Sequence, residues 1–545
     1  MTTSTPPNWP HCGHAADPAT DPVGCRGIHV PGHTVCLAHL ESAARAAYFE
    51  ELQPGGDVDH RGTAFDENLL VELLNALYDT RTRCPTLGEA RFDGAIFTER
   101  AHFDGATFTK GARFVQVTFE EVAWFFGARF MEGAQFTRSS FDHLAMFDEA
   151  IFDGDISFYG AEFSASASFN DAQFIQDVSF GAARFSTLHS LGPFRCNGTL
   201  DFSMAVFAAP VTIEANAERI LCQRARWEST ATLRFHHSTL DLSDAVINQP
   251  VAIVDSDRWL PHLESSGIRE GVRITSLRGV DAAQLTLTNV DLSQCWFSGA
   301  FHLDQLRLEG NCRFSLPPRF RSKRRVLAEE RNLRAQGRRF PVVSRWLQWG
   351  MPEIPDQVHT LPEPYVLAGT YRQLRKAFED AKDEPGAADF YYGEMEMRRH
   401  KRNSTPRAER LLLRVYWLLS GYGLRASRAL GWLATAMMAT ILLMMGFGLP
   451  TESPKQTATG TVPADGGKVS FEIDKEDPRN PTGDRFTSKR FDKALNVTIN
   501  SVVFRSSGQD FTTAGTYIEM ASRLSEPVLL GFAGLAIRGR VKRGS

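Results

Sequence analysis

The sequence lacks the short motifs that mark the common catalytic centres. It contains no nucleophile elbow, no phosphate-binding glycine loop ending in Lys-Ser or Lys-Thr, and no paired carboxylates in a recognisable setting. We therefore expect that the protein is not an enzyme.

A secretory signal peptide is also missing from the first residues, which read MTTSTPPNWP and are polar and rich in proline. We expect the N-terminal part to be cytosolic, with cysteines that are free or metal-bound rather than disulfide-paired. The net charge of −4 is small, but it is unevenly distributed. Residues 90–188 carry 14 acids and 7 bases, a net of −7, whereas bases outnumber acids over residues 320–428.

Tyrosine and tryptophan are few, at 10 and 9, against 39 phenylalanines, and the spacing of the phenylalanines predicts the fold. An eleven-residue unit repeats nine times from Ala90 to Leu188, beginning ARFDGAIFTER and AHFDGATFTKG, with phenylalanines at two fixed positions. A helix would need steps of three and four, whereas these steps of five and six suit a coil of short straight edges. The repeated rings are Phe92, Phe97, Phe103, Phe108, Phe114, Phe119, Phe125, Phe130, Phe136, Phe141, Phe147, Phe152, Phe158, Phe163, Phe169, Phe174, Phe180 and Phe185.

Small residues stand two positions before most of these phenylalanines, so a narrow interior can fill without voids. Glycine, aspartate, serine and threonine occupy the outward and turn positions, as tight turns require. We therefore predict a β-solenoid whose phenylalanines stack in ladders and serve only as its core.

This pattern resembles the pentapeptide-repeat family. The resemblance implies a mainly β protein built on a right-handed quadrilateral β-helix, here over residues 89–319. The extra residue in every second unit implies a coil longer than four faces of five, at two eleven-residue units per turn. The steps of five and six persist from Leu191 to Ile213, and steps of nearly five return from Leu277 to Leu308. The interval 214–270 is irregular, and we expect a distorted continuation or an insertion there.

Residues 1–44 contain a group of cysteines and histidines that predicts a structural zinc site. The expected ligands are Cys12, Cys25, Cys36 and His39, with His14 and His33 as alternates. The two-residue gap in Cys36-x-x-His39 lets neighbouring side chains hold one tetrahedral ion. The alternative is a disordered tail with incidental thiols. Leu37–Tyr78 contains the helix-like stretches ESAARAAYFEEL and ENLLVELLNALY, and we expect residues 45–88 to form a helical cap on the solenoid.

Two stretches near the C-terminus predict transmembrane helices. Residues 429–449 contain no charge over 21 positions, which is enough to span a bilayer, although a buried core helix is the alternative. The flanking Arg425 and Arg428 place the preceding side in the cytoplasm. The second stretch, 516–537, contains Glu519 and Arg523, which can pair along one helix face. The basic tail 538–545 is expected in the cytoplasm, and the polar loop 450–515 outside it.

The order of segments here resembles the two-helix pore module of potassium channels: an outer helix, a pore helix at Ala494–Phe504, a filter loop and an inner helix. A potassium filter needs a glycine-rich strand lined by carbonyl groups. The corresponding residues 504–510 read FRSSGQD, which retains one glycine and places Arg505 near a cation path. Potassium conduction is therefore disfavoured, and an anchor or another kind of pore remains open. The pore-like or intramembrane candidates are Arg505, Gly508, Asp510, Glu519 and Arg523.

Residues 320–428 predict a cytosolic helical linker. Two helices are expected at Tyr371–Ala381 and Ala387–Arg399, separated by Pro385-Gly386. The string YRQLRKAFEDAKDEPGAADFYYGEMEMRR resembles the linker of membrane-attached pentapeptide-repeat proteins that carry a channel-like C-terminus. Arg410–Leu424 is amphipathic and suits a helix at the membrane interface.

The leading interpretation is a membrane-anchored scaffold at the plasma membrane of a bacterium, whose cytosolic β-helix binds an unknown protein partner. Its transmembrane helices are also candidates for homo-oligomerisation. One alternative is an ion channel-like protein with a solenoid that senses or gates. A second is a DNA-mimicking gyrase-binding protein, as the resemblance allows. Arg113, Arg129 and Arg184 within the acidic repeats argue against that mimicry, and we do not expect nucleic acid to be a partner.

Overall fold

The structure is a computed structural model of the 545-residue chain. It describes residues 6–255, 271–317, 324–336, 362–400, 406–450, 456–461, 470–475, 478–479, 483–503, 505 and 508–541. The chain forms two compact units, Met1–Phe390 and Tyr391–Ser545, and each is described by itself.

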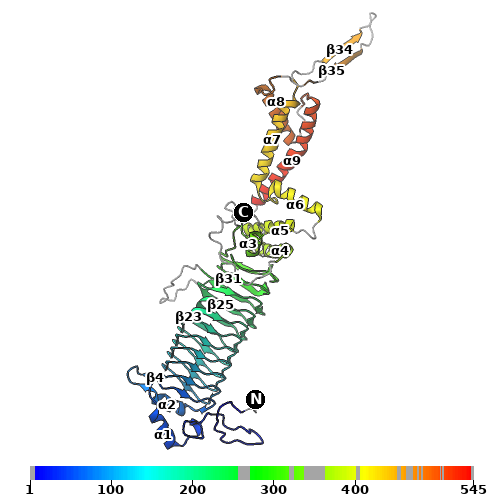
Figure 1. Ribbon diagram of the computed structural model, residues 1–545. Helices are drawn as coiled ribbons and strands as arrows, with labels where there is room; N and C mark the ends of the chain where they lie inside the picture. The colour runs from blue at the N-terminus through cyan, green and yellow to red at the C-terminus, as the bar shows by residue number, and fades with distance from the viewer. Residues whose placement is uncertain are drawn as a thin grey trace. The chain divides into compact units, whose positions relative to one another are not determined.

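The first unit contains a β-solenoid with four faces (Figure 1). On the first face, β5 (Ala90–Arg91) pairs in parallel with β9 (Ala112–Arg113), which places Ala90 beside Ala112, two repeat units further along the chain. The other three faces repeat with the same offset. The predicted solenoid and its coil of two eleven-residue units are confirmed. The remaining strands of these coils are β6 (Ile96–Phe97), β7 (Ala101–His102), β8 (Thr107–Phe108), β10 (Thr118–Phe119), β11 (Ala123–Trp124), β12 (Arg129–Phe130), β13 (Ala134–Gln135), β14 (Ser140–Phe141), β15 (Ala145–Met146), β16 (Ile151–Phe152), β17 (Ile156–Ser157), β18 (Glu162–Phe163), β19 (Ala167–Ser168), β20 (Gln173–Phe174), β21 (Val178–Ser179) and β22 (Arg184–Phe185).

The phenylalanines fill the interior in four ladders. All 18 rings of the repeat are at most 1% exposed. Within a ladder the rings are nearly parallel: the centroids of Phe114 and Phe136 lie 4.8 Å apart with 1° between their planes. Between ladders they meet edge to face, as Phe125 and Phe136 do at 87°. Both arrangements are favourable for aromatic pairs, and each buried ring contributes roughly 1.5–3 kcal/mol relative to exposure.

The coil then becomes shorter between β23 (Ser190–Asp201) and β25 (Val211–Leu221). Leu191 still pairs with Ile213 at the offset of the repeat, but Thr199 pairs with Arg219 after two register shifts, each of which removes one residue from the coil. The second face adopts the same shorter offset, because Val206 of β24 (Val206–Phe207) pairs with Arg226 of β26 (Arg226–Trp227). The two extra residues of each coil are therefore removed on one strand pair.

The solenoid continues through most of the interval that the sequence marked as irregular. Its next strands keep the shorter offset and are β27 (Ala231–His236), β28 (Thr239–Asp241), β29 (Val246–Ile247) and β30 (Val251–Asp255). The offset then increases sharply, since Thr239 pairs with Arg273 of β31 (Arg273–Ser276) and Val251 pairs with Leu285 of β32 (Leu285–Thr288). The prediction of an irregular segment over 214–270 was too broad: the insertion lies between Asp255 and Gly271, and residues 256–270 are outside the described part of the chain.

Two helices and a first, enlarged coil close the N-terminal end (Figure 1). Val58 of β1 (Val58–Asp59) pairs with Ala90 of β5, and Ala64 of β2 (Ala64–Phe65) pairs with Ile96 of β6, so this coil is longer than those of the repeat. The added length holds α2 (Glu67–Ala76), whose buried leucines face the core and whose N-terminus is capped by the Asp66 carboxylate. The coil thus begins at Val58, earlier than the predicted boundary at residue 89. The other elements here are η1 (Leu37–His39), α1 (Ser42–Glu51), β3 (Tyr78–Asp79) and β4 (Cys84–Leu87).

Side chains from the following helices close the C-terminal end. The last strand of the solenoid is β33 (Arg307–Glu309), and η2 (Ala282–Gln284) lies in the coil before it. Backbone N–H groups of the final coil have no further coil to bond. Glu329 of α3 (Ala328–Gln336) accepts from the N–H groups of Phe297 at 2.5 Å and Ser298 at 3.1 Å. Gln373 of α4 (Pro364–Asp380) accepts from Leu303 at 3.2 Å.

The break between the two linker helices falls slightly earlier than the sequence predicts. Helix α4 ends at Asp380, Lys382 adopts a φ of 58°, and α5 runs Glu384–His400. Pro385 therefore lies in the first turn of α5, where a missing N–H costs nothing, and does not separate the helices. Residues 320–323, 337–361 and 401–405 of the predicted linker lie outside the described residues, as do residues 318–319 at the end of the predicted β-helix.

The second unit is helical, with one hairpin. Its elements are α6 (Arg407–Ser420), α7 (Ala426–Leu443) extended by η3 (Met444–Gly448), β34 (Gln456–Thr461), β35 (Ser470–Lys475), α8 (Ser488–Val502) and α9 (Thr513–Val541). The polar loop predicted over 450–515 thus contains an antiparallel hairpin and a helix. Lys542 to Ser545 of the predicted tail lie outside the described residues.

Replacing one ring should test the ladders. We expect Phe136→Ala to lower the free energy of unfolding by about 3–5 kcal/mol, because the substitution leaves a cavity that the neighbouring rings cannot close. Urea unfolding followed by circular dichroism measures this loss. Tyr159→Ala is the control, since Tyr159 is 41% exposed and the change should have little effect. Equal losses for the two variants would contradict the ladder arrangement.

Glu329 should make the stability of the C-terminal end of the solenoid depend on pH. Burial raises the pKa of Glu329 from 4.5 to about 7, against the opposing effect of its hydrogen bonds. The stability that comes from the neutral form is fully present below pH 4.5 and is lost as the pH rises to about 7. We expect a loss on the order of 3 kcal/mol across that window.

Thermal unfolding of the full chain from below pH 4.5 to above pH 7 measures this effect. Glu329→Gln keeps an oxygen acceptor for the two N–H groups but cannot ionise, so its melting temperature should fall less as the pH rises. Glu162→Gln is the control, because Glu162 is an exposed residue. A wild-type and a Glu329→Gln profile of the same shape would rule out Glu329 as the source.

Candidate metal centre and C-terminal helices

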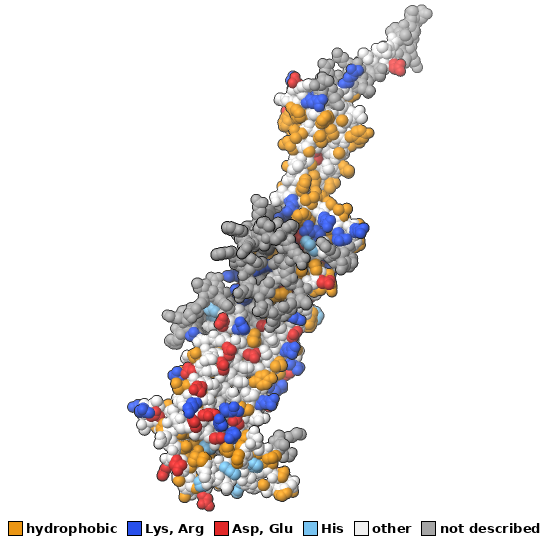
Figure 2. Space-filling model, viewed as in Figure 1, with side chains coloured by type: hydrophobic (Ala, Val, Ile, Leu, Met, Phe, Trp, Pro, Cys, Tyr) orange, Lys and Arg blue, Asp and Glu red, His pale blue; other side chains and the backbone are white. Residues whose placement is uncertain are grey.

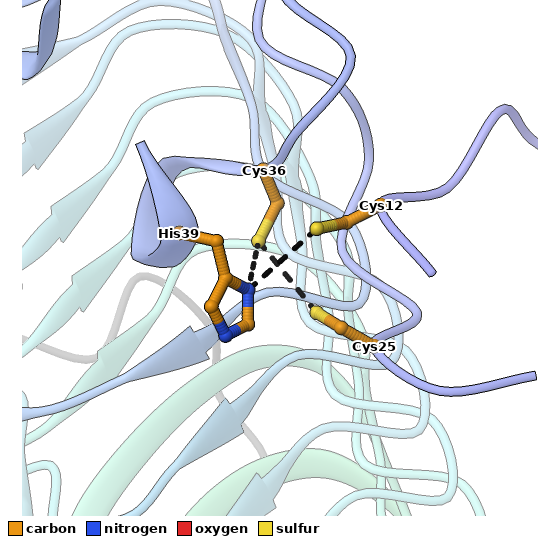
Figure 3. Close-up of side chains that lie close together, drawn as sticks. All are labelled: Cys12, Cys25, Cys36 and His39. Carbon is orange, nitrogen blue, oxygen red and sulfur yellow. Dashed lines mark hydrogen bonds between the residues drawn. The ribbon is translucent and has the colours of Figure 1, made fainter. Parts of the chain in front are cut away.

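Three thiols and one imidazole meet near the N-terminus (Figure 3). The ligand atoms of Cys12, Cys25, Cys36 and His39 all lie within 4.8 Å of one another. The Sγ atoms of Cys25 and Cys36 are 3.6 Å apart, and Nδ1 of His39 lies 3.4 Å from Cys36 Sγ and 3.6 Å from Cys12 Sγ. A tetrahedral zinc ion, with bonds of about 2.0–2.3 Å, separates its ligand atoms by about 3.5–3.8 Å. The arrangement therefore fits one tetrahedral ion.

Two paired segments and a short helix position these ligands. Cys12 donates its N–H to the carbonyl of Gly27 at 2.8 Å, and Cys25 donates to His14 at 3.0 Å, so Cys12 and Cys25 lie on facing segments. Cys36 immediately precedes η1, whose single turn brings His39 to the same side. A Cβ on Gly27 would lie 2.6 Å from the Cβ of Cys36, so that only glycine allows Cys36 to approach.

The cluster is joined to the first coil of the solenoid. Ile28 donates its N–H to the carbonyl of Arg61 at 2.7 Å, and the Arg61 guanidinium lies over the Trp9 ring at 5.1 Å. A Cβ on Gly62 would lie 2.3 Å from the carbonyl oxygen of Arg26. An ion in the cluster would therefore fix this segment against the end of the β-helix.

The electrostatics of the thiols suit a cation. A hydrogen bond from Cys36 lowers the pKa of the Cys25 thiol, and the same bond with burial raises the pKa of Cys36. Thiolates are the coordinating form, so a bound divalent ion would displace the protons of these thiols.

The two alternate ligands of the sequence analysis do not join the cluster. The ring of His14 stacks on that of His39 with centroids 4.1 Å apart, so His14 contacts a ligand without being one. His33 is exposed, and its backbone N–H closes a turn on Val30.

The repeat region belongs to a known class of sequence. Residues 82–118 and 147–188 match the family model described as pentapeptide repeats (9 copies). The solenoid is a pentapeptide-repeat domain. Comparison of the chain with curated proteins and with solved structures gives no match. The pentapeptide-repeat match lies within the β-helix, so it assigns nothing to the metal cluster or to the C-terminal helices.

Two helices that follow the pentapeptide-repeat domain are long and apolar enough to cross a membrane, Ala426–Gly448 and Thr513–Arg538. Figure 2 shows hydrophobic side chains gathered over α7 and α9, with basic side chains at either end. The large apolar side chains that are exposed on these helices are Leu430, Trp432, Met438, Leu442, Leu443, Phe447, Tyr517, Met520, Leu524, Val528, Leu530, Leu535 and Ile537. A contiguous exposed surface of this kind marks contact with a membrane or another protein.

Helix α8 packs against both of these helices. Arg490 of α8 donates to the carbonyl groups of Met445 at 2.9 Å and Leu449 at 2.7 Å, which have no helical partner at the end of the first long helix. A Cβ on Gly515 would lie 2.3 Å from the carbonyl oxygen of Gly448, so these two glycines allow the helices to meet closely.

The pore-like candidates are only partly brought together. Glu519 and Arg523 form an ion pair at 2.8 Å, and Arg523 also donates to the carbonyl of Arg505 at 3.5 Å. Arg505 and Gly508 are exposed and Asp510 is exposed in the loop before α9. Phe504, Ser506 and Ser507 of the expected filter lie outside the described residues.

The structure adds a polar contact that the sequence did not single out. The hydroxyl of Thr440 on α7 donates to Glu526 on α9 at 2.8 Å, and the Glu526 side chain is fully buried. Glutamate within an apolar stretch was the available signal, but its partner is 86 residues away.

Metal titration of the full chain should show one site. We expect one equivalent of Co²⁺ to produce thiolate-to-metal charge-transfer absorption near neutral pH, and the signal should weaken in acid because the thiols protonate. Cys36→Ser should abolish it. Cys84→Ser should not, since Cys84 lies outside the cluster. Unchanged absorption in Cys36→Ser would exclude this set of ligands.

Proposed function

We propose that this protein is a membrane-anchored scaffold whose pentapeptide-repeat domain presents a rigid surface to a protein partner. The observation that carries the proposal is the exposed apolar surface of α7 and α9, in a chain whose pentapeptide-repeat domain keeps its apolar rings almost all interior. Pentapeptide-repeat proteins are generally structural or interaction proteins, which favours binding over catalysis.

One end of the helical unit has the composition of a membrane boundary. Trp417 of α6 lies beneath the guanidinium groups of Arg399 at 4.5 Å and Arg428 at 4.9 Å. Trp432 donates to the carbonyl of Leu418 at 3.1 Å. Tryptophan and arginine are enriched where helices leave the bilayer.

The composition of helix α6 also agrees with a membrane boundary at this end of the helical unit. Its outward apolar side chains Leu411 and Leu412 are 62% and 65% exposed, while Arg407, Arg410 and Arg414 supply positive charge. Such a helix lies in the interface with its apolar side toward the acyl chains. By the positive-inside rule, this basic flank supports a cytoplasmic location for α6 and the pentapeptide-repeat domain. A bacterial plasma membrane remains the prediction.

Zinc is the metal that we propose for the N-terminal cluster. Three thiolates and one imidazole are a closed structural set, with no position left for a substrate. The ion would stabilise a segment that contains little core of its own, and so hold the cap at the end of the β-helix.

A channel is the second candidate, because α7, α8 and α9 follow the order of a pore module and α8 packs against both long helices. Against this, Glu519 pairs with Arg523 on its own helix and Glu526 bonds Thr440 within the same chain. Polar groups that pair within one chain favour an anchor over a water-filled path, although one buried carboxylate oxygen of Glu526 has no hydrogen-bond partner among the described residues.

Alkaline carbonate extraction of membranes tests the anchor. We expect the full chain to stay in the pellet, and Leu442→Asp with Leu524→Asp to release it, because each charge in the apolar zone costs about 2.5–3.5 kcal/mol. Leu316→Asp is the matched control, since Leu316 is 57% exposed in the first unit. Release of the wild-type chain would contradict membrane insertion.

Ion flux in proteoliposomes separates the two candidates. An anchor gives no flux above that of empty vesicles. Flux that disappears in Glu519→Gln would establish the channel and displace the scaffold as the main function.

A further inference from the structure

We propose that the third face of the pentapeptide-repeat domain binds a basic amphipathic helix of a partner protein, in a site centred on Trp124. The proposal rests on the scaffold function and names the surface that would serve it. The site lies on β11 and β15, which pair directly, with Trp124 beside Met146.

Outward side chains on this part of the face are apolar, unlike most of the β-helix surface. Trp124 and Met146 are half-buried, and Phe126 is 42% exposed. Ala123 donates its N–H to the carbonyl of Leu144, so Val122 and Leu144 are also neighbours on adjacent coils. On the first face the corresponding outward residues are polar: Arg91, Arg113, Gln135, Ser157 and Ser179.

The dimensions of this patch suit a single helix. Trp124 lies on β11, with Val122 directly before the strand and Phe126 in the turn after it, so the three residues span at most about 13 Å of extended chain, and adjacent coils are about 4.8 Å apart. The apolar side chains of an amphipathic helix at positions i, i+4 and i+7 cover about 10.5 Å along its axis. A helix laid along β11 would therefore bring its apolar stripe over these residues.

Carboxylates surround the patch and determine the charge of the partner. Glu120 and Glu121 precede β11, and Asp148 and Glu149 follow β15 at the opposite corner. Asp104 lies one coil earlier and contacts His102 at 3.2 Å. Arg100 adds one base at the edge nearest the N-terminal end. The excess of carboxylates favours lysine and arginine on the partner helix.

The fourth face supplies a matched comparison. Ile151 and Ile175 are outward apolar residues there, and Ile175 is 41% exposed. The neighbouring Asp153 pairs with Arg129 at 2.9 Å, so its charge is compensated within the chain. Across the repeat, that face offers apolar area without outward aromatic side chains.

Binding of a defined peptide tests the site. The probe is a fluorescein-labelled helix of about 18 residues, with leucines on one side and lysines on the other. The protein is the full chain in phosphatidylcholine nanodiscs, with empty nanodiscs subtracted. We expect saturable binding in fluorescence anisotropy that weakens with salt.

Substitutions assign the binding to the third face. Trp124→Ser with Phe126→Ser should weaken it by about 30-fold, because aromatic anchors dominate such interfaces. Ile151→Ser with Ile175→Ser should leave it unchanged. Glu120→Gln, Glu121→Gln and Glu149→Gln together should weaken it by about tenfold and reduce its salt dependence. These glutamates are exposed, so this variant keeps the interior of the fold intact even if the aromatic one does not.

Several results would overturn the site: no saturable binding up to about 100 μM peptide, equal binding of a twin peptide with glutamate in place of lysine, or an equal loss in the fourth-face control. The proposed membrane anchor is tested separately from this site. A chain that stays in the carbonate pellet without binding the peptide overturns this site alone, and a chain that binds the peptide but is released by carbonate overturns the anchor alone.

Discussion

The stacking of identical side chains at a fixed offset is the constraint on which the first unit depends. Each coil bonds the next through short parallel strands, most of only two residues, which could not hold a sheet by themselves. Phenylalanine above phenylalanine supplies the packing that makes these short strands persist. The offset must be the same on all four faces, because a slip on one face would move its rings out of the ladders. When the coil shortens, it does so on one strand pair, and the second face adopts the new offset in the same turn.

A stack of this kind has two open ends, and the chain closes them by different means. Helix α2 and the Cys-His cluster cover the first coil. The segment that carries the cluster has few apolar side chains, and there a bound metal ion can replace a hydrophobic core. At the other end, Glu329 and Gln373 accept from backbone N–H groups that a further coil would have bonded. Burial of Glu329 in this position penalises the charged form of its carboxyl group. The pKa of Glu329 is raised for this reason.

The second unit differs: it buries a small apolar cluster around Met444 and Val497, exposes many large apolar side chains on α7 and α9, and makes polar contacts in its interior. The Glu526–Thr440 contact and the capping of α7 by Arg490 satisfy groups that lipid could not. An exterior of this kind, in a chain whose β-helix has an interior aromatic core, agrees with a protein that has one part in lipid and one in water. On the first unit, the Trp124 patch gathers outward apolar side chains, among which Phe126 is 42% exposed.

The sequence by itself determined the β-solenoid, its coil of two eleven-residue units, all 18 core rings and the two long apolar helices, because each depends on spacing along the chain. It also placed Cys36 and His39 together, since one helical turn joins them. The predicted ligands Cys12, Cys25, Cys36 and His39 are the four that the structure brings together. The sequence did not exclude His14, because its position depends on which backbone segments pair. The true extent of the insertion, the contact of Glu329 with Phe297 and that of Thr440 with Glu526 were likewise decided by tertiary structure. In each of these the partners are far apart in sequence, and only the packing of whole elements brings their atoms within bonding distance.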